Sequence, residues 1–129
     1  MNGKHILDTN IIIRLFAEDA KILQKVDESE EIFVPSIVIG ELCYGAFNSK
    51  KVKSNISKIE KLTSEVEILD CDYDIGMEYG EIKKELKDKG TPIPDNDIWI
   101  AAISRQYNIE LISRDEHFKY VENLKWIKW

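Results

Sequence analysis

Short apolar runs of strand character alternate with longer segments of helical periodicity along the chain, and this alternation restricts the possible folds more than any other feature. The runs expected to form strands are Lys4–Asp8, Ile32–Val34, Glu67–Leu69, Glu110–Ser113 and Leu124–Ile127. Helical periodicity covers Ile11–Ala17, Ala20–Glu28, Ile37–Phe47, Lys51–Ser64, Tyr73–Lys89 and Asn96–Tyr107. Strands that alternate with helices form a parallel sheet covered on both faces. We therefore expect an α/β fold, with the last strand at an edge of the sheet.

The ends of three predicted helices carry recognisable signals. Ser36 after Pro35 and Asp95 after Pro94 are plausible N-caps. Gly90 follows a helix that ends in lysines, as expected of a glycine that terminates a helix.

The size of the chain predicts one domain over residues 1–129. Its composition, 43% hydrophobic and 33% charged, is that of a globular protein. No apolar stretch approaches the roughly 20 residues that cross a bilayer, and the N-terminus lacks a signal-peptide core. Cys43 and Cys71 have no metal-ligand spacing and suit a reducing compartment. A cytoplasmic protein without membrane association is expected.

The net charge of −6 at first argues against a partner made of nucleic acid, because phosphate contacts require Lys and Arg. The argument fails if several carboxylates are metal ligands. Two bound divalent cations would add four positive charges and leave −6 + 4 = −2. The net charge therefore excludes nothing until the acids are placed.

Four acids from separate segments are expected at one rim of the sheet. Ligands of open α/β sheets bind beyond the carboxyl ends of the strands. Asp8 ends the first predicted strand, and Asp115 follows the fourth. Asp97 lies in the first turn of a helix that starts near the same edge, and Glu41 lies about one and a half turns into another.

Each acid also has an ordinary structural explanation. Asp97 could complement a helix dipole, and Asp8 could cap the helix that follows it. Asp115 could belong to a turn, and Glu41 could be a solvated helix residue. No single acid is specific evidence for a functional site, so the prediction depends on the convergence of all four.

The stretches "LDTN", "SIVIGELCYG", "PDNDIWIAA" and "LISRDEHF" occur in this order, and together they resemble the PIN-domain ribonucleases. The sequence is most similar to the VapC-type toxins of type II toxin–antitoxin modules, from Lys4 to Trp126. The resemblance implies a PIN-like three-layer α/β/α sandwich around a mainly parallel sheet. It also implies an endoribonuclease that hydrolyses RNA with Mg²⁺ or Mn²⁺, a cognate antitoxin and usually a homodimer.

Carried over to this chain, the resemblance implies catalytic acids at Asp8, Glu41, Asp97 and Asp115. Mg²⁺ and Mn²⁺ prefer oxygen ligands, and Asp8 and Asp97 are the best direct ligands of the metal. Asp115 should complete the metal shell, directly or through water. Glu41, on the "SIVIGELCYG" helix, could orient or deprotonate the attacking water. The reverse assignment, with this glutamate as a ligand and Asp115 outside the shell, stays open, as does the number of metal ions.

Other residues are expected to support these acids or the substrate. Thr9 and Asn10 begin a helix, where backbone N–H groups favour anions, and Ser113 matches a family position for Ser or Thr. His117 and Phe118 match a common pair that we interpret as structural packing, and Asp95 is an acid that the family does not require.

Basic and aromatic side chains are candidates for contacts with RNA. Possible phosphate contacts are Arg14, Arg105, Arg114 and the lysines of "NSKKVKSN", although such charges more often form a solvated face. Tyr44, Tyr79 and Trp99 could stack on bases, although aromatic residues more often belong to a core or an interface.

Three other functions compete with a ribonuclease. A phosphatase with an Asp nucleophile needs a second acid two residues after Asp8, where this chain has Asn10. The sequence shows no clear match to the pattern of acids and lysine in a receiver-like signalling domain. A non-catalytic PIN-like adaptor would bind RNA or protein without cleavage, but all four family acids are present.

Overall fold

The computed structural model describes residues 3–129, in which five strands form one parallel sheet. The strands are β1 (Lys4–Leu7), β2 (Glu31–Pro35), β3 (Glu67–Leu69), β4 (Glu110–Ile112) and β5 (Trp126–Ile127). Their order in the sheet is β3-β2-β1-β4-β5, and every neighbouring pair is parallel. The first strand is therefore central, and the tail forms an edge strand as predicted. Residues 1 and 2 of the predicted domain lie outside the described part of the chain.

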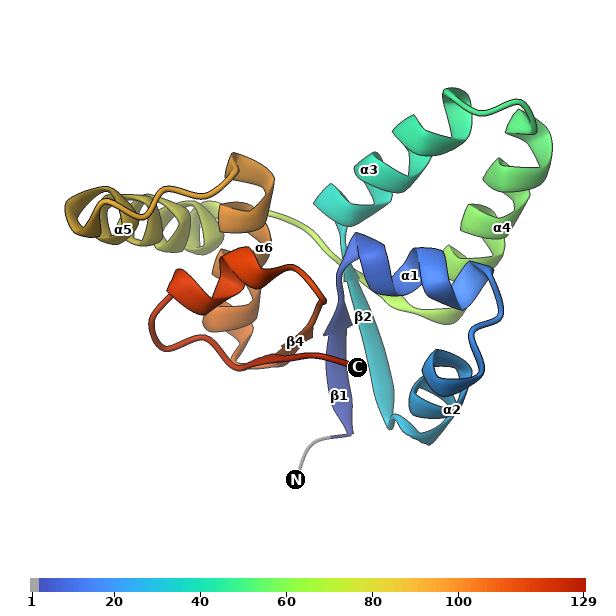
Figure 1. Ribbon diagram of the computed structural model, residues 1–129, viewed down its shortest axis with the longest axis horizontal. Helices are drawn as coiled ribbons and strands as arrows, with labels where there is room; N and C mark the ends of the chain where they lie inside the picture. Colours follow the sequence, from blue (N-terminus) through green and yellow to red (C-terminus); the bar gives the residue numbers. More distant parts are fainter. Residues whose placement is uncertain (1–2) are drawn as a thin grey trace.

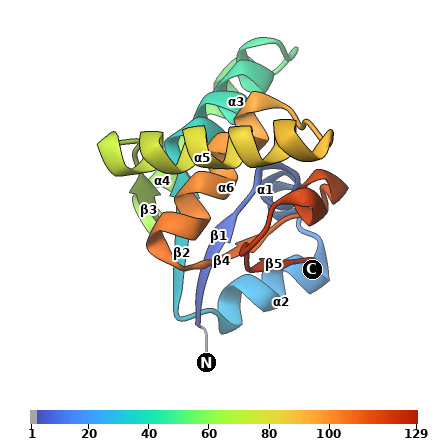
Figure 2. The ribbon, with the colours of Figure 1, turned by 90° about the vertical axis from the view of Figure 1, so that its left-hand side faces the viewer.

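Helices cover both faces of this sheet. They are α1 (Thr9–Phe16), α2 (Ala20–Glu28), α3 (Ser36–Phe47), α4 (Val52–Glu65), α5 (Tyr73–Lys89) and α6 (Asp95–Tyr107), with a 3₁₀ helix, η1, at Glu116–Tyr120. Figure 1 shows α5 and α6 on one side of the strands and α1 to α4 on the other. Figure 2, seen from the side of α5 and α6, shows both helices in front of the strands. The predicted three-layer α/β/α sandwich is confirmed.

The central strands are apolar on both faces because both faces are covered. Ile6 and Leu7 of β1 and Leu111 and Ile112 of β4 have no solvent-exposed surface. Burial of one such side chain contributes about 1.5–3 kcal/mol, so these pairs hold the middle of the sheet rigidly. In helix α6, residues 100–103 are all fully buried, which fixes this helix against the core. None of the helices in residues 3–129 is long and apolar enough to cross a membrane.

Two of the three predicted helix signals are wrong. Pro35 and Pro94, with ψ of 143° and 146°, occupy the N-cap positions of α3 and α6, so that Ser36 and Asp95 are the first helical residues. Neither helix start has a side-chain cap. The prediction for Gly90 is confirmed: this residue ends α5 with φ of 72°, a conformation that costs glycine little.

Arg105 joins α6 to α5 and is not free to bind phosphate, contrary to its interpretation as a phosphate contact. Its side chain is 10% exposed and forms ion pairs with Glu78 at 3.1 Å, Glu81 at 3.0 Å and Glu85 at 3.3 Å. A guanidinium nitrogen also donates to the carbonyl oxygen of Glu122 at 3.2 Å. The three glutamates recur every three or four residues along one face of α5, which is the spacing that a single guanidinium can bridge.

Candidate active site

Asp8 lies at the carboxyl end of the central strand and is 4% exposed. Its backbone N–H donates to the carbonyl oxygen of Ile112, which continues the β1–β4 ladder to this residue. One carboxylate oxygen accepts the Thr9 N–H at 2.8 Å, so Asp8 is also the N-cap of α1. This bond starts α1 at Thr9, two residues before the predicted start at Ile11. The capping interpretation and the site interpretation of Asp8 are therefore compatible.

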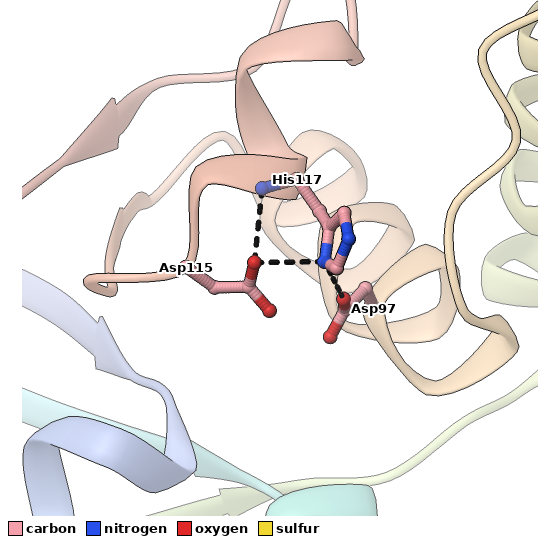
Figure 3. A group of neighbouring side chains, drawn as sticks. All are labelled: Asp97, Asp115 and His117. Carbon is pink, nitrogen blue, oxygen red and sulfur yellow. Dashed lines mark hydrogen bonds and ion pairs between the residues drawn. The ribbon is translucent and has the colours of Figure 1, made fainter.

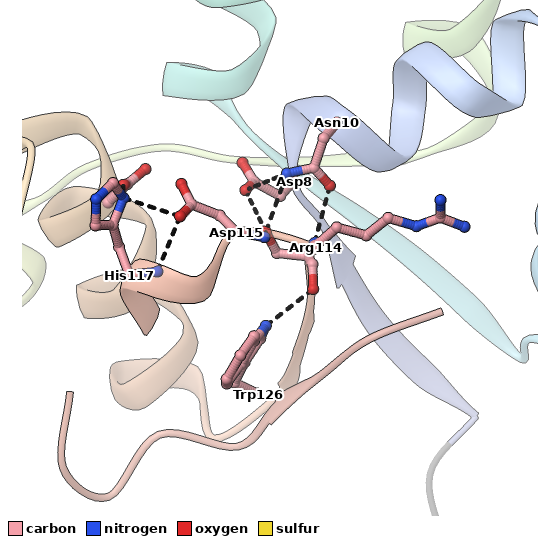
Figure 4. A network of polar contacts seen from close by, with 8 residues as sticks. Asp8, Asn10, Arg114, Asp115, His117 and Trp126 are labelled. Carbon is pink, nitrogen blue, oxygen red and sulfur yellow. Dashed lines mark hydrogen bonds and ion pairs between the residues drawn. The ribbon is translucent and has the colours of Figure 1, made fainter. Parts of the chain in front are cut away.

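The hydroxyl of Ser113, which is fully buried, ties the end of β4 to Asp8. It donates to the second Asp8 oxygen at 2.6 Å and accepts the backbone N–H of Asp115 at 3.0 Å. The side-chain amide of Asn10 donates to this hydroxyl at 3.2 Å, and its oxygen accepts the Arg114 N–H at 3.0 Å. Figure 4 shows the resulting bridge between the loops after β1 and β4. Thus "LDTN" and "LISRD" form one network.

Asp97, Asp115 and His117 form the second part of the acidic cluster (Figure 3). The imidazole Nδ1 of His117 lies 2.9 Å from an Asp115 oxygen and 3.3 Å from an Asp97 oxygen. The Asp97 side chain is 13% exposed and that of Asp115 is 28% exposed, so both carboxylates are largely shielded from solvent. His117 is therefore not the packing residue that its sequence position suggested, whereas Phe118 is 1% exposed and packs in the core.

Glu41 reaches the same rim from α3 and is held by two neighbours. The Thr9 hydroxyl donates to one of its oxygens at 2.6 Å, and the Asn96 amide donates to the other at 3.2 Å. Glu41 therefore connects the start of α1 to the start of α6. Asn96 was not singled out from the sequence, because it stands between two more conspicuous acids in "PDND".

Mutual repulsion and burial disfavour the fully ionised state of the acidic cluster. Burial raises the pKa of Asp8, with smaller contributions from the charges of Glu41 and Asp115 and opposing hydrogen bonds from Ser113 and Thr9. The pKa of Asp97 is raised to about 7, first by burial and then by Asp115 and Asp8, while His117 lowers it. These effects link all four predicted acids through space, although their segments are far apart in the sequence.

The donor set at this rim fits a hard divalent cation. It consists of carboxylate oxygens that belong to different elements, and the neighbouring charges raise the pKa of Asp8 and Asp97. A cation that binds there removes this repulsion, and Mg²⁺ and Mn²⁺ take such oxygens as ligands. Asp8, Asp97 and Asp115 are the residues that could hold it.

Three other predicted contacts have different surroundings. Asp95, the extra acid, points away from the cluster and binds the Tyr79 hydroxyl and the Lys83 ammonium, each at 3.0 Å. The Tyr79 ring stacks on Trp99 at a centroid distance of 4.0 Å, which makes them partners of each other in this structure. The Arg114 guanidinium extends away from the acids (Figure 4). It donates to the carbonyl oxygen of Trp129 at 2.8 Å. A phosphate contact of Arg114 stays a prediction.

Comparisons with known proteins find similar sequences and structures over nearly the whole chain. Residues 5–124 match the model of the PIN domain. The chain is 35% identical to Ribonuclease VapC1 of Haemophilus influenzae, over 97% of each chain. It is 28% identical to the tRNA(fMet)-specific endonuclease VapC of Shigella flexneri, over 98% of each. Among solved structures, VapBC2 from Rickettsia felis bound to a DNA fragment from its promoter superposes with a TM-score of 0.88 and 33% identity, over 98% of each chain.

Proposed function

The chain belongs to the PIN-domain family, and from this premise we propose that it is a metal-dependent endoribonuclease that acts as the toxin of a toxin–antitoxin module. The observation that carries the proposal is the gathering of Asp8, Glu41, Asp97 and Asp115 at the carboxyl rim of the sheet. Its relatives are named as ribonucleases, and one of them as a tRNA endonuclease, which supports RNA as the substrate.

The residues of the rim have complementary roles in this proposal. Asp8, Asp97 and Asp115 hold the cation, and Ser113 and Asn10 fix the orientation of Asp8. When bound, Mg²⁺ or Mn²⁺ supplies charge stabilisation at the phosphodiester and lowers the pKa of a water molecule.

Glu41 takes the proton of the attacking water. Its two oxygens are held by Thr9 and Asn96, so that the carboxylate faces the rim in a fixed orientation. Because the start of α1 adjoins this position, the positive end of its helix dipole favours a substrate phosphate there. The water oxygen then bonds to phosphorus, the bond between phosphorus and the leaving ribose oxygen breaks, and that oxygen takes up a proton from solvent.

The proposal is tested by incubating the purified protein with total RNA, with Mg²⁺ or Mn²⁺ and with a chelator. Cleavage should require the cation, and Asp8→Asn should abolish it. Asp95→Asn is the matched control, because Asp95 lies only two residues before Asp97 yet binds Tyr79 and Lys83 outside the cluster, and this variant should keep full activity. Cleavage that persists in the chelator would contradict the mechanism. RNA binding that both variants retain, without any cleavage, would favour the non-catalytic adaptor instead.

Two grooves that share Phe16 and Lys58, the second of which reaches Glu41, support an antitoxin as the partner. A groove of about 760 Å³ between α2, β2 and α4 has an apolar floor that includes Leu15, Phe16, Leu23 and Leu62. Its rim carries six acids and two lysines: Glu18, Asp27, Glu30, Glu31, Glu65, Glu67, Lys58 and Lys61. A second groove of about 320 Å³ leads from there past Ile59 to Glu41. An amphipathic segment with basic residues fits such a surface, and its Arg could reach the acids.

The antitoxin proposal is tested by co-expression with the product of a neighbouring short reading frame. A stable complex with suppressed RNA cleavage is expected. Leu23→Glu, in the groove and away from the acids, should weaken the complex and leave cleavage by the free protein intact.

Exposed apolar side chains support the expected homodimer. Tyr44 and Phe47 of α3 are 72% and 67% exposed, and Tyr73 and Met77 of α5 are 78% and 61% exposed. Large apolar side chains grouped on a surface are typical of interaction sites. RNA as substrate and the free thiols of Cys43 and Cys71 are consistent with a cytoplasmic location.

A further inference from the structure

Within residues 3–129, His117 places an imidazole nitrogen against the acids of the rim, and the proposed hydrolysis does not use it. Its side chain is 48% exposed, so burial does not force it toward the acids. Its Nδ1 nevertheless lies between two carboxylates, at 2.9 Å from Asp115 and 3.3 Å from Asp97 (Figure 3). The ligand atoms of all three residues lie within 4.8 Å of one another.

These separations match those of ligands that share one cation. Two donor atoms about 2.1 Å from an octahedral ion and at right angles lie about 3.0 Å apart, and opposite donors lie about 4.2 Å apart. The two distances from Nδ1 fall close to the shorter value, and the ligand atoms of the whole group lie within 4.8 Å of one another, a bound somewhat above the longer value. The imidazole therefore needs little movement to serve as a ligand.

The turn that carries His117 holds the imidazole in place. The backbone N–H of His117 donates to the Asp115 carboxylate at 2.9 Å, which starts the 3₁₀ helix η1. The next residue, Phe118, is buried in the core and anchors the same turn. The position of the ring is thus set by two neighbours in sequence, one polar and one apolar.

We propose that His117 is a nitrogen ligand of the metal site and makes it prefer Mn²⁺, or another first-row transition-metal ion that accepts imidazole, over Mg²⁺. This inference rests on the proposed metal-dependent function. The physical reason is that Mg²⁺ demands oxygen ligands and keeps much of its water shell, whereas transition-metal ions also bind imidazole. A site made of carboxylates alone would lack this preference.

Pulsed electron paramagnetic resonance of the Mn²⁺-loaded protein tests the proposal without reference to activity. Wild-type protein should show modulation from a directly bound ¹⁴N nucleus, and labelling with ¹⁵N-histidine should replace it by the ¹⁵N signal. The chain has only two histidines, so the assignment is simple. His117→Gln should lose the signal. His5→Gln should keep it, because His5 contacts Glu110 and Ser29 instead of the acids of the rim.

Calorimetric titration gives the second readout. His117→Gln should weaken Mn²⁺ binding about tenfold and change Mg²⁺ binding less than about twofold, a split that general damage to the fold would not produce. Bound Mn²⁺ without nitrogen modulation in the wild type would overturn the role of His117 while leaving the ribonuclease proposal intact. The same holds for modulation that persists in His117→Gln. Failure of the wild type to bind Mn²⁺ while it binds Mg²⁺ would overturn only the role of His117, and failure to bind either ion would overturn both proposals.

Discussion

Replacing Asp97 by Asn should stabilise the metal-free protein at neutral pH while abolishing cleavage. In the folded protein the pKa of Asp97 is about 7, against 3.8 for an unperturbed Asp. Between these two pH values the folded state binds more protons than the unfolded state, so stability falls as the pH rises from about 4 to 7. The difference of about three pH units corresponds to at most about 4 kcal/mol at pH 7.5.

We expect the free energy of unfolding of Asp97→Asn to exceed that of the wild type by about 1–2 kcal/mol. The gain is smaller than the maximum because solvent at the open rim screens the charges and because the variant loses its ion pair with His117. Urea unfolding at pH 7.5 and pH 4.5 in a chelator measures the gain, which should shrink at the lower pH. Asp88→Asn, which changes an exposed pair with Lys84, is the control and should shift stability by no more than about 0.5 kcal/mol.

Addition of Mg²⁺ or Mn²⁺ should make the wild type more stable than Asp97→Asn, since a cation that binds only the folded wild type stabilises it by mass action. Equal or lower stability of Asp97→Asn at pH 7.5 without metal would refute the reasoning that repulsion and burial at the rim oppose folding.

Three further changes test other features. Ser113→Ala removes the buried hydroxyl that joins Asp8 to the Asp115 N–H, and should cost about 1–3 kcal/mol in urea unfolding and about tenfold in cleavage rate. Arg105→Ala should cost about 2–3 kcal/mol, measured in the same way, by separating α5 from α6 without a direct effect on metal affinity. Phe47→Glu should shift the protein from dimer to monomer in light scattering at matched concentration, and an unchanged mass would exclude α3 from the interface.

The sequence was most informative where local physics decides the structure. The bounds of α2, α5 and β3 are those predicted, because periodicity and clear ends determine them. The acids converge because three of them follow strands or begin helices at one edge of a parallel sheet, a property of the topology. The predicted domain boundaries stay a prediction.

The remaining features depend on tertiary neighbours that no local pattern reveals. Arg105 became a bridge only because α5 packs beside α6 and presents three glutamates. Asp95 lost its predicted capping role because Pro94 occupies that position, and its carboxylate turned to Lys83. The inward position of His117 follows from the turn at Asp115, which a motif alone does not describe.

The hydrogen bond between Asp8 and Ser113 joins residues that are 105 positions apart. While the chain is being synthesised, its first carboxylate leaves the ribosome long before the serine that orients it. Under the proposed function, a nascent or prematurely terminated polypeptide carries no organised nuclease centre. The cell would therefore meet the toxic activity only after Ser113 has been translated, an interval in which an antitoxin made beforehand could reach each new molecule.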